Sequence, residues 1–477
     1  MLLIALIAVP ALAAAASFFA PRSVRRVTLL GTAILHVALV AVLWANPGDT
    51  AFDGWLADDA LGRIVLTLVS VLFLAVAHYA IGYLRESELR GGRAFASCLL
   101  GFLAAASLIV LSHQLVLMWI GLESTTLLVS PLIFHRDDRR SLEAVWKYLV
   151  LSSVAIAFAL LGVFLLATSQ PLVGAGRALV IDDLMLHATS LDQTWLRMAF
   201  VFVLIGCGTK MGIAPLHSWK PDTYGEAPAL VGALMAGALT SCAFLGLARV
   251  SAICFAAGAG AFVRPALIAF GVASLLIAAA FIIGQRDVKR LLAYSSVEHM
   301  GLLAIGLGVG GVGAYGAVLH TLNNGLAKGL LFLAAGNVVL ASGTSTAVGI
   351  RGVARRLPRS GALLAIGLFA VTGSPPFGLF LSEFSIFSGV IGESHPWLAV
   401  AMVALLAIIF IGLAAMILEI IYAEPAADAP PVASERGWLV VAPAALAVCV
   451  LLLGVYIPAP LARALSSAAA TLGGRAP

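Results

Sequence analysis

The sequence predicts an all-α polytopic membrane protein, one domain that crosses the bilayer about fourteen times. Of its 477 residues, 62% are hydrophobic and only 11% are charged, and the mean hydropathy of +1.07 lies far outside the range of water-soluble domains. Apolar stretches long enough to cross ~30 Å of hydrocarbon at ~1.5 Å per residue recur along the whole chain. These runs are continuously apolar, whereas the strands of a membrane barrel would alternate.

The apolar runs define the predicted spans in order. Residues 1–20 have no basic region and no convincing polar cleavage region, so we expect a true first span and not a signal peptide. No polar stretch between spans is long enough to fold separately. The predicted spans are 2–20, 27–46, 63–84, 95–112, 113–134, 145–168, 197–219, 228–250, 264–284, 290–309, 312–341, 361–391, 396–422 and 438–460.

Lysine and arginine predict the orientation, because cytoplasmic loops carry an excess of both. With the N-terminus outside, 19 basic residues fall on the inside and seven arginines fall outside. We therefore expect both termini on the outer side of the membrane. We also expect this multi-pass protein to lie in the bacterial inner membrane, which places both termini on the periplasmic side. The inside set is Arg22, Arg25, Arg26, Arg85, Arg90, Arg93, Arg136, Arg139, Arg140, Lys147, Lys220, Arg286, Lys289, Arg290, Arg351, Arg355, Arg356, Arg359 and Arg436.

Two basic residues, Lys210 and Lys328, remain well inside predicted spans. A cation at that depth costs ~2.5–3.5 kcal/mol on insertion scales, so it usually faces the bundle interior with a partner or water. Glu123 and Glu383 are the comparable acidic residues. One interpretation is that buried ion pairs only hold helices together; the other is that these groups carry ions.

Prolines favour the second interpretation. Lys210 is followed by Pro215 in span seven, and Pro375 and Pro376 precede Glu383 in span twelve. Segments five spans apart cross the membrane in opposite directions. Matching broken helices in inverted repeats indicate a transport site, because a break exposes backbone groups that must line a cavity or water.

Span eleven carries a polar stripe. His320, Asn324 and Lys328 are spaced i, i+4, i+8 and therefore lie along one helix face over ~12 Å. A lone polar residue in a membrane helix more often makes an interhelical hydrogen bond, but three on one stripe favour a proton relay.

Span ten adds His299. Histidine exchanges protons near neutrality, whereas lysine does so only when it is removed from water, a condition that we expect for Lys210 and Lys328. The neighbouring Glu298 lies on a different helix face, and we interpret it as structural.

Four runs carry a resemblance to a known family: "GTKMGIAPLHSWKPDTYGEAPALVGALMAG", "RDVKRLLAYSSVEHMG", "HTLNNGLAKGLLFLAAGNVV" and "GSPPFGLFLSEF". They resemble the proton-translocating, antiporter-like membrane subunits of respiratory complex I, membrane-bound hydrogenases and Mrp-type sodium/proton antiporters. The match extends from about residue 95 to about 422. Because of "LEAVWKYLVL" and the terminal glutamate in place of a lysine, the chain most resembles the F component of hydrogenase-4.

The resemblance implies fourteen helices, with the seventh and twelfth broken. It also implies two inverted five-helix repeats, here 95–250 and 264–422, after three N-terminal helices (1–94) and before a final helix (438–460).

The resemblance also implies roles for single residues. Glu123 would be the fifth-helix glutamate paired with Lys210, the seventh-helix lysine. His299 matches the tenth-helix histidine and Lys328 the eleventh-helix lysine, with His320 one or two turns away. Glu383 would then lie at the outward exit.

Two positions depart from the family pattern. Ser241 stands where many members have a lysine on helix eight, and a hydroxyl cannot store a proton, so water would have to bridge that point. Lys220 replaces a leucine before Pro221 and Asp222. That added charge, near Asp222 and Glu226, places the side of proton uptake in question.

Nothing in the sequence indicates redox chemistry of its own, a cofactor or a metal site. Its five cysteines, Cys98, Cys207, Cys242, Cys254 and Cys449, form no close pairs and show no haem or cluster spacing. We expect the lipid bilayer, other membrane subunits and a peripheral redox arm as partners, and no nucleic acid.

The favoured function is proton translocation through a buried Glu/Lys/His relay, without redox chemistry of its own, as an antiporter-like membrane subunit of a hydrogenase-4-like or complex I-like (NADH:quinone oxidoreductase-type) respiratory complex. The alternative is an ion transporter without redox partners, either a Mrp-type antiporter subunit or the membrane component of an inorganic-carbon uptake complex. The sequence leaves open whether the ion is a proton or sodium. The short segment after span fourteen leaves no room for a long lateral helix, so we expect an inner or middle position in an assembly.

Overall fold

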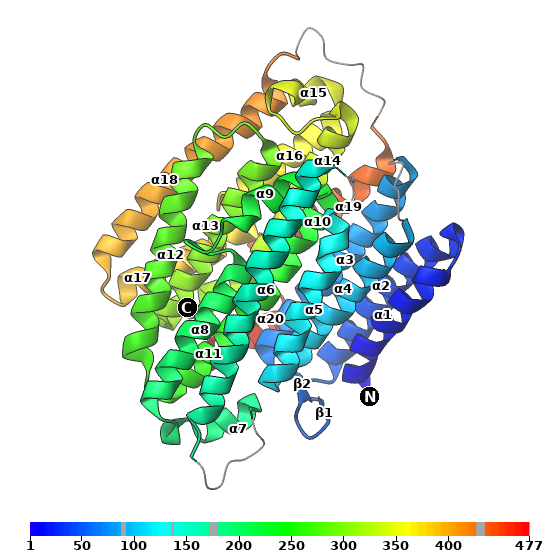
Figure 1. The fold of residues 1–477 in the computed structure, drawn as a ribbon. Helices are drawn as coiled ribbons and strands as arrows, with labels where there is room; N and C mark the ends of the chain where they lie inside the picture. The colour runs from blue at the N-terminus through cyan, green and yellow to red at the C-terminus, as the bar shows by residue number, and fades with distance from the viewer. Residues whose placement is uncertain (87–91, 135–137, 172–178, 426–434, 477) are drawn as a thin grey trace.

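We describe the protein from a computed structural model. It describes residues 1–86, 92–134, 138–171, 179–425 and 435–476, and Figure 1 shows them as one long bundle of helices. Arg90 and Arg136, which the sequence analysis placed in inside loops, lie outside the described residues.

The structure confirms the all-helical membrane fold. Within the described residues, thirteen helices are long and apolar enough to cross a membrane. Two shorter apolar helices supply the twelfth predicted span in two halves. The unbroken spans are α1 (Leu2–Phe19), α2 (Arg22–Ala45), α3 (Ala60–Glu86), α4 (Gly92–Leu111), α5 (Leu115–Ile133), α6 (Arg139–Thr168), α12 (Gly260–Ile282), α13 (Val288–Val309), α14 (Gly311–Ser342), α18 (Pro396–Tyr422) and α19 (Gly437–Val455).

Both predicted breaks are present. The seventh span consists of α8 (Gln193–Met211) and α9 (Trp219–Glu226), and the twelfth of α16 (Pro358–Val371) and α17 (Gly378–Gly392). Gly212 ends α8 at φ +76°, a left-handed conformation that glycine adopts without a steric penalty. The sequence placed the end of span seven at residue 219, but the helix stops eight residues earlier and resumes there.

The eighth span contains a second irregularity. It begins as α10 (Ala229–Leu234), passes through one π-helical segment (Met235–Leu239) and continues as α11 (Thr240–Ala256). A Cβ at Gly237 would lie 2.8 Å from the carbonyl oxygen of Gly325 on α14, so this segment packs directly against that helix. Single π turns inside α-helices are frequent at functional sites.

The spans divide into a centre and a periphery. The eighth span and α13 are entirely buried within the protein, and α14, the longest helix, is largely so. The helices at the two edges in Figure 1, α1 and α2 at one side and α18 at the other, bury well under half of their residues. The predicted relay residues on α13 and α14 therefore lie on helices that are surrounded mainly by other helices of the protein.

Short elements cover the two ends of the bundle. A two-stranded hairpin, β1 (Thr50–Ala51) and β2 (Leu56–Ala57), and the helix α7 (Ile181–Leu186) lie at one end, and α15 (Val353–Arg356) lies at the other (Figure 1). After the last span, α20 (Ala459–Thr471) folds back against α3 and α14.

Candidate functional site

The centre of the bundle holds three lysines that are completely buried. Lys210 on α8 and Lys328 on α14 are 0% exposed, as the sequence predicted, and so is Lys220 on α9. The assignment of Lys220 to an inside loop is therefore wrong. It lies in the second half of the broken seventh span, and its side chain turns back into the break.

The ammonium group of Lys210 binds hydroxyl groups. It donates to Thr126 Oγ1 on α5 and, at 3.3 Å, to the hydroxyl of Tyr148 on α6. Thr126 in turn contacts Glu123 Oε2 at 3.4 Å, and Ser153 donates to Glu123 Oε1 at 2.9 Å. The predicted pair of Glu123 and Lys210 is thus linked through Thr126, and the described contacts include no direct ion pair between them.

Lys328 has a similar environment on the other side of the bundle centre. Its ammonium group donates to Ser295 Oγ on α13 at 2.6 Å, and Ser295 lies 3.3 Å from Glu298 Oε2. Glu298 is itself buried, with only 3% of its surface exposed. The interpretation of Glu298 as a structural neighbour of His299 missed this contact, which arises because Ser295 and Glu298 are one helical turn apart.

Both lysine sites share one arrangement. A hydroxyl residue stands between an ammonium group and a carboxylate that is three positions away on the hydroxyl residue's own helix. A hydroxyl both donates and accepts hydrogen bonds, so it can pass a proton between two groups that do not touch. The spacing of three residues was visible in the sequence, but the identity of the lysine partner was not.

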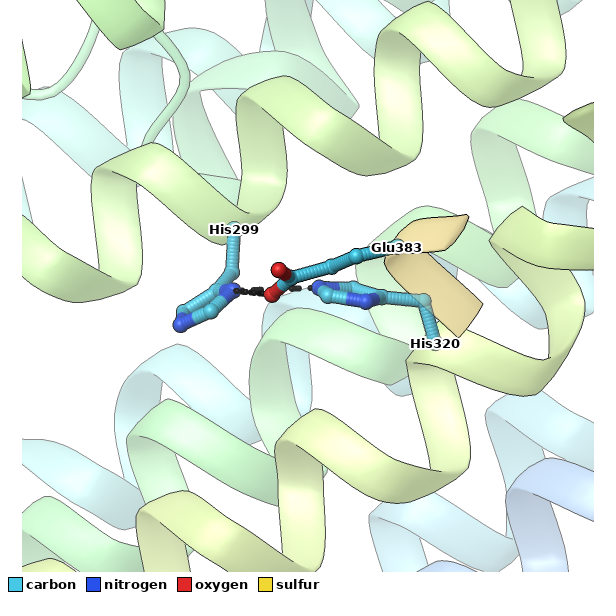
Figure 2. Close-up of side chains that lie close together, drawn as sticks. All are labelled: His299, His320 and Glu383. Carbon is cyan, nitrogen blue, oxygen red and sulfur yellow. Dashed lines mark hydrogen bonds and ion pairs between the residues drawn. The ribbon is translucent and has the colours of Figure 1, made fainter. Parts of the chain in front are cut away.

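Figure 2 shows a third group, in which His299, His320 and Glu383 meet from α13, α14 and α17. The Nδ1 atom of His299 lies 3.1 Å from Nε2 of His320 and 4.0 Å from Glu383 Oε1. The two imidazoles are completely buried, whereas the Glu383 side chain is 16% exposed. The structure thus brings three of the predicted site residues together, although 84 positions of sequence separate the first from the last.

The hydrogen bonds assign the tautomer of His320. Ser382 Oγ donates to the carbonyl of Leu379 at 2.9 Å, so it accepts from His320 Nδ1, which lies 2.9 Å away. The proton of neutral His320 therefore sits on Nδ1, and Nε2 presents its lone pair to His299. His299 donates to that lone pair, which gives the pair a defined direction.

The stripe on α14 continues from His320 to Lys328 through Asn324. Both polar atoms of the Asn324 side-chain amide are buried without a hydrogen bond to any described group. Buried polar atoms of this kind are normally satisfied by water. The face between the histidine pair and Lys328 is thus polar over its whole length.

Lys220 lies between the group around Lys210 and the group around Lys328. Its ammonium group donates to the carbonyl of Met211 at 2.6 Å and lies 3.5 Å from the carbonyl of Ser296. Met211 follows Lys210 on α8, and Ser296 follows Ser295 on α13. Lys220 is also close enough to Lys328 for their charges to interact.

Aromatic side chains pack beside both Lys210 and Lys220: the ammonium group of Lys210 lies 5.3 Å from the ring centroid of Tyr148, and that of Lys220 lies 5.7 Å from the ring centroid of Tyr224. The ring centroid of Trp219 lies 5.2 Å from that of Tyr148 and 6.1 Å from that of Tyr224. The indole nitrogen of Trp219 donates to the carbonyl of Thr209 at 2.8 Å. These rings fix the start of α9, and so they hold Lys220 against the end of α8.

Comparison with known proteins identifies the family. The model of the family described as NADH:quinone oxidoreductase/Mrp antiporter, TM, matches residues 112–409, which is more than half of the chain and contains every predicted site residue. The chain belongs to this family.

Relatives in this NADH:quinone oxidoreductase/Mrp antiporter family cover most of the chain. A hydrogenase-4 component F homolog from Methylacidiphilum infernorum is 35% identical, over 75% of each chain. The NADH-quinone oxidoreductase subunit N of Desulforudis audaxviator is 33% identical, over 84% of this chain and 80% of its own.

Solved structures have the same fold as this family member. The membrane-bound sulfane sulfur reductase, an archaeal respiratory membrane complex, contains a chain with a TM-score of 0.88 at 20% identity, covering 99% of this chain and 98% of its own. A chain of the Mrp complex from a Dietzia species gives 0.85 at 20% identity, covering 99% and 97%. A chain of respiratory complex I from Thermus thermophilus gives 0.78 at 25% identity, covering 95% and 97%.

Ser241 occupies the buried position that the family resemblance associates with a lysine. It is 1% exposed, and its hydroxyl donates to the carbonyl of Gly237 at 2.6 Å, at the π-helical segment. The Ser241 hydroxyl is therefore committed to its own helix.

The charges near Lys220 are arranged differently from the prediction. Asp222 Oδ2 accepts from Lys147 at 2.9 Å, and Asp222 Oδ1 lies 3.3 Å from Arg290. Asp222 therefore joins α6, α9 and α13 at the surface, and Lys220 points away from it.

Sequence reasoning missed an ionic cluster at the end of the bundle where α7 lies. Arg249 is 4% exposed, and it donates to Asp59 at 2.6 Å and to the carbonyl of Ser112 at 2.9 Å. His113 lies 3.6 Å from Asp59 and 3.5 Å from Asp182. Arg249 seemed an ordinary residue at a span end because its partner lies 190 positions away in sequence.

This cluster favours charged forms. Although burial opposes it, the contacts with Asp182 and Asp59 raise the pKa of His113 above its usual value. Although burial also opposes ionisation of Asp59, Arg249 and His113 lower its pKa. The hydrogen bond from His113 lowers the pKa of Asp182. The cluster therefore ties α7 by charge to the residues before α3 and before α5 and to Arg249 of α11.

Proposed function

We propose that this chain is a proton-translocating, antiporter-like membrane subunit of a hydrogenase-4-like or complex I-like respiratory complex. One observation carries the proposal: three buried lysines, two of them linked to carboxylates through hydroxyl groups, and a buried histidine pair beside Glu383 lie together in the interior of the bundle. Ion pairs that only joined helices would need neither the hydroxyl bridges nor a histidine pair with a defined proton. The names of the relatives support the class of complex.

The proposed relay has two parts, one around Lys210 and one around Lys328. Glu123, Thr126 and Lys210 exchange a proton at one side, and Glu298, Ser295 and Lys328 exchange one at the other. From Lys328 the proton passes along the polar face of α14 to the histidine pair. Glu383, which is partly exposed at the break between α16 and α17, is then the exit group.

We propose that Lys220 connects the two parts. Ser241 cannot store a proton, but Lys220 reaches the backbone at both Met211 and Ser296 and is as fully buried as the two predicted lysines. A lysine at this place supplies the titratable group that helix eight lacks. The charge at the seventh-span break thus belongs to the path and not to the surface.

The two breaks support an inverted-repeat arrangement, with residues 95–250 and 264–422 as the repeats. Each break interrupts a span that carries or adjoins a proposed relay residue, Lys210 in one case and Glu383 in the other. The excess of lysine and arginine on one set of loops supports a place in the inner membrane with both termini outside. Moving Lys220 out of that set does not reverse the excess.

In the proposed complex, partner subunits carry out all electron transfer. Moving one charge against 100 mV costs ~2.3 kcal/mol, and a peripheral redox arm would supply that energy. The second candidate is a cation/proton antiporter subunit without redox partners, moving sodium as well as protons. The family name and the Mrp-like fold favour it.

Copurification combined with transport separates these functions. We expect the affinity-purified chain to bring partners that carry iron–sulfur clusters or nickel, and proteoliposomes of that complex to take up protons only during redox turnover. Proton uptake driven by a sodium gradient, with no redox subunit present, would instead establish the antiporter.

A substitution at Lys220 tests the connecting step. We expect Lys220→Met to lower proton uptake per turnover about tenfold or more, since water alone would then have to bridge the two parts. Lys147→Met is the control, because Lys147 is a half-exposed lysine in a surface ion pair with Asp222. If Lys220 only caps the end of α8, Lys220→Met will reduce the amount of folded complex and leave protons per turnover unchanged.

A further inference from the structure

We propose that His299, His320 and Glu383 form a binding site for a divalent transition-metal cation such as Zn²⁺, and that the bound cation blocks the relay. The binding step stands on the geometry of these three residues. The blocking step rests on the proposed function. The cation is an inhibitor in this proposal and not a resident cofactor.

The donor atoms are nearly in place. One nitrogen of each imidazole and one carboxylate oxygen all lie within 4.8 Å of one another, with 3.1 Å between the two nitrogens and 4.0 Å from His299 Nδ1 to Glu383 Oε1. Zinc sites with bonds of ~2.0–2.1 Å place their ligand atoms roughly 3.3–3.4 Å apart. Small side-chain movements are therefore enough to complete the site. Two histidines and one glutamate are also a known zinc ligand set, with a fourth position left for water.

The hydrogen bond between His320 and Ser382 favours the binding of a cation at this site. Ser382 holds the proton of His320 on Nδ1, so Nε2 already presents its lone pair to the centre. Metal-binding histidines usually have their second ring nitrogen held in this way. In the structure described, the Nδ1 proton of His299 lies between the two imidazoles. A bound cation would take the place of this proton. His299 would then either lose the proton or carry it on Nε2.

The three ligands differ in how deeply they are buried. Glu383 is 16% exposed, and it lies beside the break that ends α16. Pro375 and Pro376 in that break are exposed. Gly373 has φ +62°, and a Cβ there would collide with Glu383 Oε2, so the backbone leaves room for this carboxylate. Glu383 is therefore the least buried of the three ligands, and a cation entering at this break would meet its carboxylate before the buried imidazoles.

Occupancy would stop proton transfer at this point. Both facing nitrogens and the carboxylate would be bound to the metal, and none could then accept a proton from the α14 stripe. Substitution at the site should thus remove binding and inhibition together.

The first experiment measures binding alone, on the full-length chain purified without a histidine tag. We expect one Zn²⁺ per chain by calorimetry, and Co²⁺ to give the visible absorption of a tetrahedral site. His320→Gln and Glu383→Gln should each weaken binding about tenfold or more, and Ser382→Ala should weaken it about 10–100-fold. His187→Gln, on an exposed histidine, and His36→Gln, on a buried histidine outside this cluster, are the controls.

The outcomes separate the two steps. If His320→Gln and Glu383→Gln bind Zn²⁺ as tightly as the unsubstituted chain, while remaining folded by circular dichroism, the site proposal is overturned. If binding behaves as expected, Zn²⁺ should inhibit proton uptake by the reconstituted complex, and a high concentration of a chelator should restore it. Tight binding that leaves proton uptake intact would overturn the block, and with it the place of this cluster in the relay, but not the metal site.

Discussion

Replacing Lys210 with arginine is expected to abolish proton uptake while leaving the complex assembled. Arginine keeps the positive charge, and its guanidinium can still donate to Thr126 and Tyr148, the two hydroxyl groups that Lys210 contacts. It does not deprotonate in proteins. A relay that must load and unload a proton at this position will therefore fail, whereas a static contact between α5, α6 and α8 will survive.

The expected loss is large. Proton transfer by a positioned side chain typically contributes ~10²–10⁴-fold to a rate, so Lys210→Arg should lower turnover-driven proton uptake by about that range. Lys210→Ala should fail under both interpretations, and it sets the background. Lys147→Arg is the matched control, because Lys147 lies on the half-exposed surface in ion pairs with Glu143 and Asp222.

The hydroxyl bridge offers a second readout of the same step. Thr126→Val keeps the shape of the side chain but removes the group between Glu123 and Lys210, whereas Thr126→Ser keeps the hydroxyl. We expect proton uptake to fall further in the valine variant than in the serine variant, at equal amounts of folded complex. Full proton uptake in Lys210→Arg would show that this lysine only joins helices.

Much of the fold follows from the sequence because two strong signals agree. Continuous apolar runs predict where the chain crosses the membrane, and prolines such as Pro215 and Pro375 predict where helices break. The structure places helices at these runs and breaks at both proline positions. The π-helical segment at Met235–Leu239 has no such signal, since its residues continue the apolar run on both sides.

The site was predictable only where a charge stood alone in an apolar run. Lys210 and Lys328 are conspicuous for that reason. Lys220 is not, because it follows a proline break and precedes Pro221 and Asp222, a pattern typical of a loop. Its burial depends on its side chain reaching back to the end of α8 and across to α13, a tertiary arrangement that no local pattern encodes. The link from Glu298 through Ser295 to Lys328 was missed for a related reason, because Lys328 comes from another helix.

Replacing Lys328 with alanine is expected to lower proton uptake as strongly as the change at Lys210. Lys328 on α14 contacts Ser295, and through it Glu298. Alanine removes the proton carrier between that carboxylate and the polar face of α14. Ser295 and Glu298 would remain in place, but no group would be left to accept a proton from them.

Comparison with Asn324→Ala tests whether the loss at Lys328 is specific to a residue that can carry a proton. The Asn324 amide lies on the same stripe and has no hydrogen bond to any described group, so water can replace it and Asn324→Ala should weaken proton uptake much less. Glu298→Gln should approach the loss at Lys328, because the amide cannot exchange a proton as a carboxylate does. Measured in proteoliposomes with the partner subunits present, equal effects at Lys328 and Asn324 would mean that the stripe on α14 only packs helices. A large loss at Lys328 and Glu298 with a small one at Asn324 would indicate that titratable side chains are needed at the first two positions, because all three side chains are buried.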